Sequence, residues 1–130
     1  MKHNPYHLIR PWLFARSTED PEVAHETALR YLQRLEASPR LMAVLRKRLA
    51  ASDKKLAQNL MGLHFAGPIG LAAGFLKNLD GMQGMAALGP GFIEGGTVTA
   101  LEQTGRPRPR IWRQPRYGTL VNCMGFPNNG

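Results

Sequence analysis

Residues 70–97 alternate between apolar runs and an amphipathic stretch, and this pattern constrains the fold more than any other feature. The stretches "GLAAG" at 70–74 and "GFIEGGTVTA" at 91–100 are typical of buried strands that end in small residues. Between them, "LDGMQGMAALG" at 79–89 places apolar residues at helical spacing. A strand, a helix and a strand over about 30 residues form a βαβ unit, whose two strands are parallel. We therefore expect an α/β fold.

The first 55 residues predict a different kind of structure, a pair of helices. The stretch "STEDPEVAHETALRYLQRL" at 17–35 begins with Ser17 or Thr18 as a possible cap and continues with apolar residues at helical spacing. The stretch "SPRLMAVLRKRLAA" at 38–51 repeats the pattern. Both helices would have basic faces. A helical hairpin packed on a core and a helical pair lying on an anionic membrane surface both fit these residues.

The charge of the chain favours anionic partners. There are 17 lysine and arginine residues against 9 aspartate and glutamate residues, a formal net charge of +8. Residues 104–118 form a basic loop punctuated by prolines, with room for a short edge strand, and 119–130 are typical of a strand running into a turn. A non-catalytic basic module that binds anionic lipid or nucleic acid is therefore one interpretation. The single cysteine and the spacing of the four histidines give no metal site.

Small residues at both predicted strand ends leave room for a ligand. Ala73-Gly74 and Gly96-Thr97 expose backbone and one hydroxyl, and in a parallel α/β barrel the ligand binds at the C-terminal ends of the strands. Lys77 would add a positive charge close to both ends. A cofactor or anion site fits this arrangement, although small strand-end residues and a solvated loop lysine are the ordinary alternative.

Four ordered motifs resemble a known family. They are "GLAAGFLKN" at 70–78, "IEGGTVTA" at 93–100, "GRPRPRIWR" at 105–113 and "LVNCMGFPNNG" at 120–130. In this order and at these spacings they resemble the N-terminal part of class 2 dihydroorotate dehydrogenase, the membrane-associated, quinone-reducing flavoenzyme of pyrimidine synthesis. The stretch "DPEVAHETAL" is also similar to that family, so the resemblance covers essentially the whole chain.

The resemblance implies an incomplete (β/α)₈ barrel over 56–130, preceded by an amphipathic helical hairpin within 1–55. It implies FMN as the cofactor, oxidation of dihydroorotate to orotate for UMP synthesis, and ubiquinone as the electron acceptor. It also implies peripheral association with the cytoplasmic face of a bacterial inner membrane, and no nucleic-acid partner. The family's catalytic base lies beyond residue 130, so we expect the 130-residue chain alone to be an inactive fragment.

The resemblance also assigns site residues by motif. The residues that would line the flavin are Ala73, Gly74, Phe75, Leu76, Lys77 and Thr97. The residues that would contact the substrate are Lys77, Asn122, Cys123, Met124, Gly125 and Phe126. His25 and Arg113 fall where the family places residues on the quinone side. A fixed ammonium at Lys77 would stabilise negative charge on the reduced flavin and hold a carboxylate.

Three positions depart from the family's pattern. Leu76 stands where the family carries an acidic residue beside the lysine, and a leucine cannot pair with Lys77. Cys123 replaces a basic residue of the substrate loop. Pro127 replaces an asparagine and removes a backbone donor. These changes predict weaker substrate binding than is typical of the family.

Overall fold

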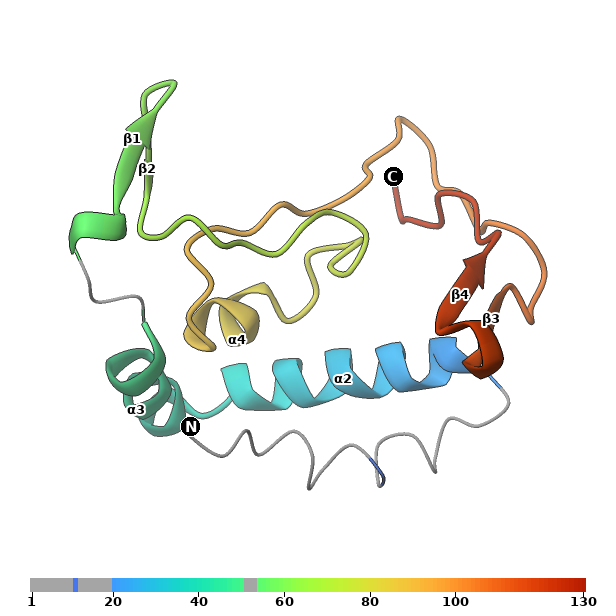
Figure 1. The fold of residues 1–130 in the computed structure, drawn as a ribbon, viewed down its shortest axis with the longest axis horizontal. Helices are drawn as coiled ribbons and strands as arrows, with labels where there is room; N and C mark the ends of the chain where they lie inside the picture. Colours follow the sequence, from blue (N-terminus) through green and yellow to red (C-terminus); the bar gives the residue numbers. More distant parts are fainter. Residues whose placement is uncertain (1–10, 12–19, 51–53) are drawn as a thin grey trace.

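The computed structural model describes Pro11, residues 20–50 and residues 54–130 (Figure 1). In the described part of the chain, the helices are α2 (Pro21–Glu36), α3 (Pro39–Leu49) and α4 (Met82–Ala87), with short 3₁₀ turns at Lys54–Leu56 and Pro115–Tyr117. The strands are β1 (Gln58–Leu60), β2 (Leu63–Phe65), β3 (Ile111–Gln114) and β4 (Thr119–Asn122). No described helix is long and apolar enough to cross a membrane.

The predicted pair of N-terminal helices is confirmed by α2 and α3, but the predicted cap is wrong. Asp20 is the N-cap of α2, and its carboxylate accepts a hydrogen bond of 2.9 Å from the backbone N–H of Glu22. Pro21 follows at the first helical position, where its missing N–H has no partner to lose. Ser17 and Thr18 lie outside the described residues. The aspartate–proline pair therefore decides where this helix begins.

Two glycines allow α4 to lie directly against α2. A methyl group at Gly84 would come within 2.6 Å of the Leu32 carbonyl oxygen, and one at Gly81 within 2.7 Å of the Leu32 side chain. The backbone N–H of Gly84 also donates to the Glu36 carboxylate at 3.0 Å. Glycine lowers helix propensity, yet here it permits a helix contact that no larger residue would allow. The short helix therefore forms where the sequence predicts one.

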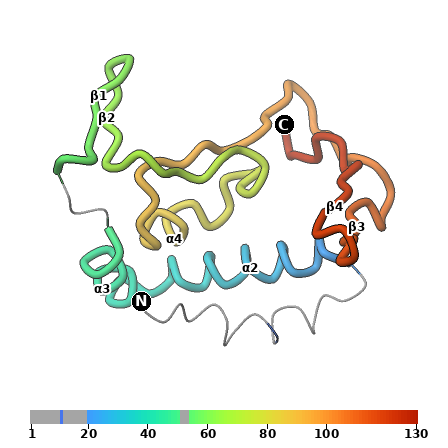
Figure 2. The backbone as a smooth tube through the Cα atoms, in the orientation of Figure 1, coloured from blue at the N-terminus to red at the C-terminus, as the bar shows by residue number. Residues whose placement is uncertain are grey.

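The predicted parallel neighbours lie side by side, as the backbone trace shows (Figure 2), but they form less regular strands than expected. Leu71 and Ile93 make an isolated parallel bridge, with hydrogen bonds from Leu71 N–H to Phe92 oxygen (3.1 Å) and from Glu94 N–H to Leu71 oxygen (2.9 Å). The expectation of two full strands over 70–74 and 91–100 is therefore wrong in extent. Glycine at 70, 74, 91, 95 and 96 weakens strand formation at the ends of both segments.

The regular strands of the described residues form two antiparallel hairpins, and these residues close no barrel. In the β1–β2 hairpin, Met61 and Gly62 both have positive φ, at 51° and 77°, as a tight hairpin turn requires. In the second hairpin, Gly118 has φ of 60° and returns the chain from β3 to β4. The predicted edge strand is β3. The strand expected after residue 118 is β4, and it pairs antiparallel with β3.

The core is small. It lies between the three helices, the segment 71–76 and the loop after β4. Its buried apolar side chains are Leu32, Met42, Leu76, Ala87 and Met124. Large apolar side chains elsewhere are exposed, among them Met61 at the hairpin tip and Ile69 before the parallel bridge. The described residues therefore concentrate their burial around the segment 71–76 and the loop after β4.

Candidate active site

A cavity of about 420 Å³ lies where the parallel segments end. It brings together most of the residues that the sequence motifs single out, although these come from four separate stretches of the chain. The predicted residues that line it are His25, Ala73, Gly74, Phe75, Lys77, Thr97, Asn122, Met124, Gly125 and Phe126. Gly96, Ile111 and Pro127 complete the lining.

The floor of the cavity is backbone from the two parallel segments. Gly74 N–H donates to Gly96 oxygen at 2.9 Å, and Gly96 N–H donates to Leu76 oxygen at 3.0 Å. Gly74 has φ of 99°, and no atom lies within 4 Å of the place where a side chain would begin. A planar group can therefore approach this backbone closely.

Lys77 brings a partly buried positive charge to the cavity. Its ammonium donates to the thioether sulfur of Met124. Burial lowers the pKa of Lys77 below its usual range, and the negative charge of Glu22 partly opposes this change. A thioether is a weak acceptor, so a ligand carboxylate or carbonyl that reached Lys77 would be a better partner than Met124.

The loop after β4, residues 122–126, is held in shape by Asn122. The Asn122 side-chain oxygen accepts a hydrogen bond of 2.8 Å from Met124 N–H, and Gly125 turns the chain with φ of 78°. Met124 is buried, whereas 63% of Phe126 is exposed at the cavity. We call residues 122–126 the substrate loop, because the family resemblance of the sequence predicts that they contact the substrate.

His25 joins α2 to the edge of the cavity. Its Nε2 lies 2.7 Å from the backbone oxygen of Phe75, and its ring packs edge-on against the Phe75 ring with centroids 4.9 Å apart. A carbonyl oxygen can only accept a hydrogen bond, so Nε2 carries the proton. Helix α2 therefore contributes directly to the cavity wall.

Three predicted residues do not line this cavity. The Leu76 side chain is 0% exposed and belongs to the core, so the expectation that it lines the flavin is corrected: only its backbone oxygen is held at the cavity floor. Cys123 is half-buried, and its N–H donates to the Arg110 oxygen at 3.0 Å. Arg113 is half-buried on β3, on the same face as the cavity-lining Ile111.

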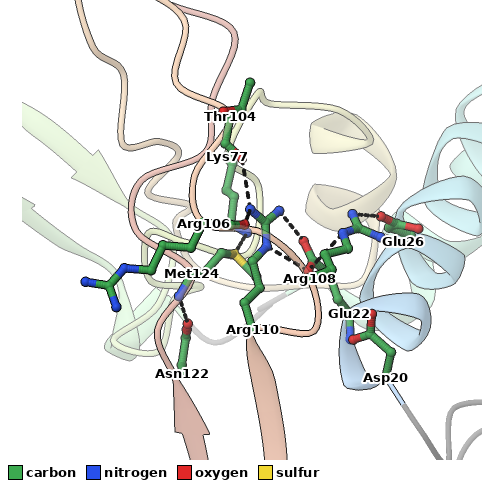
Figure 3. Close-up of polar contacts among 10 residues, drawn as sticks. All are labelled: Asp20, Glu22, Glu26, Lys77, Thr104, Arg106, Arg108, Arg110, Asn122 and Met124. Atoms are coloured by element: carbon green, nitrogen blue, oxygen red, sulfur yellow. Dashed lines mark hydrogen bonds and ion pairs between the residues drawn. The ribbon is translucent and has the colours of Figure 1, made fainter.

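A buried ion pair beside the cavity was missed by sequence reasoning (Figure 3). Glu22 and Arg110 are 3% and 6% exposed, and two hydrogen bonds of 2.7 and 2.9 Å join them. The hydrogen bonds from Arg110 hold the pKa of Glu22 below its usual range, although burial opposes them. The run "GRPRPR" indicates a solvated loop, and nothing in it distinguishes the buried arginine from Arg106 or Arg108.

Asn128 was also missed. It is 5% exposed, and its side-chain oxygen accepts hydrogen bonds from Thr99 N–H (3.2 Å), Thr99 hydroxyl (3.0 Å) and Gly130 N–H (2.9 Å). Its amide donates to the Phe126 oxygen at 2.7 Å. Asn128 thus fastens the end of the substrate loop to the segment after Thr97. The "PNN" stretch indicated a turn but not a buried amide.

Comparisons with known proteins match this arrangement to one family. Residues 55–130 match the family described as dihydroorotate dehydrogenase. Two curated relatives, both named dihydroorotate dehydrogenase (quinone), come from Acidithiobacillus ferrooxidans, at 48% identity over 96% of this chain, and Methylococcus capsulatus, at 50% identity over 95%. The chain spans 34% of the length of each.

Solved structures agree with the sequence comparisons. A dihydroorotate dehydrogenase from Eimeria tenella in complex with ferulenol superposes with a TM-score of 0.67 at 33% identity. The match covers 94% of this chain and 30% of that one. Because the family match covers residues 55–130, more than half of the chain, the chain belongs to the dihydroorotate dehydrogenase family.

Proposed function

We propose that this chain supplies the flavin-facing and substrate-facing wall of a quinone-dependent dihydroorotate dehydrogenase, which oxidises dihydroorotate to orotate in pyrimidine synthesis. The names of the two bacterial relatives support this activity. The observation that carries the proposal is the cavity, because it gathers Lys77, Asn122 and Phe126 around the open backbone of Gly74. The alternative of a non-catalytic basic module has no comparable support.

The residues at the cavity floor fit FMN. We assign Ala73, Gly74, Phe75, Lys77 and Thr97 to its binding, because small side chains and open backbone accept a planar ring and Lys77 offers a positive charge beside it. When bound, FMN supplies the acceptor for the hydride of dihydroorotate. The protein's own part is to exclude water from the ring and to place a cation where negative charge increases on reduction.

The substrate loop and Lys77 fit dihydroorotate. The ammonium of Lys77 can bind the substrate carboxylate, and the side chain of Asn122 can hydrogen-bond the amide groups of the pyrimidine ring. Phe126, exposed at the cavity, can cover the ring, while Cys123, Met124 and Gly125 supply the loop backbone. We assign proton abstraction to none of the described residues.

The helical segment within 1–55 is proposed to face quinone and membrane. α3 exposes Leu41, Val44 and Leu49 and carries Arg46, Lys47 and Arg48 in its last turn. Such a mixture suits peripheral binding to the anionic cytoplasmic face of a bacterial membrane. We assign His25 and Arg113 to the quinone side, with ubiquinone as the electron acceptor.

A hybrid enzyme tests the proposal. In it, residues 1–130 of this chain replace the matching segment of the Acidithiobacillus relative, which supplies the other two thirds of the length. We expect a yellow protein that reduces a soluble ubiquinone when dihydroorotate is added, with the unaltered Acidithiobacillus protein as the positive control. A folded hybrid that binds FMN but leaves dihydroorotate unoxidised would refute the assignment. Salt-dependent binding of nucleic acid by the 130-residue chain would favour the basic module instead.

A further inference from the structure

We propose that the buried ion pair between Glu22 and Arg110 is a positioning device, which holds the substrate loop against Lys77 and fixes that loop to α2. The function given to the loop rests on the proposed activity. The mechanical connection does not, because it runs through contacts among the described residues alone (Figure 3).

The first step is the pairing of the two side chains. Arg110 binds Glu22 through both edges of a fork, from Nε to Oε2 at 2.9 Å and from Nη2 to Oε1 at 2.7 Å. Its remaining nitrogen, Nη1, donates to the backbone oxygens of Thr104 (2.8 Å) and Arg106 (2.9 Å). A planar guanidinium bound on all sides has one permitted orientation. The loop around Arg110 is therefore set relative to α2.

The second step connects Arg110 to the substrate loop. The Arg110 backbone oxygen accepts from Cys123 N–H at 3.0 Å, and Arg106 N–H donates to Met124 oxygen at 3.1 Å. A methyl group at Gly105 would come within 2.5 Å of that Met124 oxygen and 2.6 Å of Arg110 Nη1. Residue 105 must therefore be a glycine for the Arg110 side chain and the substrate loop to lie this close together. Met124 in turn receives the hydrogen bond of Lys77, so the loop's place determines the surroundings of the ammonium.

The third step explains why an ion pair stands at this place. Buried ion pairs seldom stabilise a fold more than apolar residues of the same volume. What a forked pair adds is a fixed direction. Arg108 offers the contrast, since it also contacts Glu22, at 3.2 Å, and Glu26, but with 45% of its side chain exposed. Among the described residues, the Arg110 branch of this cluster continues by a direct hydrogen bond into Cys123.

The test compares Glu22→Gln with Glu26→Gln in the hybrid enzyme. Both variants remove one carboxylate charge from α2, one helical turn apart, but Glu26 has 42% of its side chain exposed and forms its ion pair with the partly exposed Arg108. Amide hydrogen exchange over 119–126 and steady-state kinetics are measured for both. For Glu22→Gln we expect faster exchange in the substrate loop and a KM for dihydroorotate raised about 10- to 100-fold with kcat changed far less. The FMN content of Glu22→Gln should equal that of the unaltered hybrid. Glu26→Gln should match the unaltered hybrid in amide exchange and in steady-state kinetics.

A second variant covers the case in which Glu22→Gln does not fold. The double variant Glu22→Leu, Arg110→Met removes both buried charges together, and such replacements usually preserve stability. It should loosen the substrate loop in the same way. Loop exchange like that of Glu26→Gln would overturn the positioning role, and so would a loosened loop with unchanged KM. If the hybrid did not oxidise dihydroorotate, the proposed function would be refuted. The positioning role of the ion pair would still be tested, by the comparison of amide exchange between the variants.

Discussion

The Nε2 of His25 lies 2.7 Å from the backbone oxygen of Phe75, which joins α2 to the residue that follows the open glycine of the cavity floor. One helical turn earlier, Glu22 joins the same helix to the substrate loop through Arg110. α2 is therefore joined to two sides of the cavity: to the segment of Phe75 through the His25 imidazole, and to the substrate loop through the ion pair of Glu22. This arrangement makes α2 part of the site.

His25→Phe tests the imidazole contact, because phenylalanine keeps an aromatic ring beside Phe75 and removes the hydrogen bond. The Phe75 oxygen would lose its donor, at a cost of about 1–3 kcal/mol in the free energy of unfolding. In the hybrid enzyme we expect slower reoxidation by quinone and little change in the half-reaction with dihydroorotate. Stopped-flow measurement of flavin absorbance separates the two.

The matched control is His64→Phe. His64 also makes one hydrogen bond, from Nδ1 to Asn59 Oδ1 at 2.8 Å, but it lies in the exposed β1–β2 hairpin away from the cavity lining. The His64→Phe variant should change the rate of neither half-reaction. If the two variants slowed reoxidation equally, His25 would have no particular place on the quinone side.

Lys77→Met separates function from stability. Burial lowers the pKa of Lys77, so the charged side chain destabilises the folded state. Without FMN, the variant should therefore unfold at a higher temperature than its FMN-free parent at pH 7, and this difference should shrink as the pH rises towards the ordinary lysine pKa of about 10.4, where the unfolded chain also loses its charge. Binding of dihydroorotate should fall about 100-fold or more, because its carboxylate loses a cation.

Lys54→Met is the control for Lys77→Met, since Lys54 is exposed in the first 3₁₀ turn. Calorimetry over a pH series and flavin titration with orotate give the two readouts. A Lys77→Met protein that is less stable than its parent at pH 7 would contradict the burial argument.

The sequence predicted the parts of the site that depend on local pattern. Small residues at 73–74 and 96–97 anticipated the open cavity floor, and helical spacing anticipated α2, α3 and α4. The parallel contact of Leu71 with Ile93 also followed from the strand–helix–strand order. In each case the residues on which the prediction depends lie within one helix or strand, or within two that are close in the sequence.

The features that were missed or misjudged depend on contacts between distant segments. Glu22 and Arg110 are 88 residues apart, and three arginines of one loop have the same local pattern. Leu76 was assigned to the flavin by its place in the family motif, whereas its side chain is fully buried in the core. Local composition does not report which of several similar side chains faces the core, so only the fold separates them.

Leu76→Asp tests this corrected place of Leu76. An acid at this position would resemble the family pattern, but the side chain here is fully buried, and an unpaired carboxylate there should cost about 3 kcal/mol or more in stability. Leu79→Asp is the control, because Leu79 is 46% exposed and has φ of 63°, a conformation that aspartate tolerates. Chemical denaturation of the two hybrids gives the comparison. Equal stabilities would mean that position 76 accepts an acid.

The pH dependence of stability tests the state of Glu22. Its pKa is lowered by hydrogen bonds from Arg110, so its stabilising contribution is complete above the unfolded carboxyl pKa of about 4.3 and is lost as the pH falls through the lower folded value. Glu22→Gln should therefore destabilise the hybrid by about 3–5 kcal/mol near pH 7. That difference should narrow steadily below about pH 4.

Thermal unfolding of the parent, Glu22→Gln and Glu26→Gln from neutral to acidic pH measures this directly. Glu26→Gln removes an exposed carboxylate and should cost less than about 1 kcal/mol at pH 7. A Glu22→Gln penalty that stayed constant into the acid range would mean that the Glu22 carboxylate is not the charged partner of Arg110. The contact between Glu22 and Arg110 would then depend on packing and neutral hydrogen bonds rather than on opposite charges.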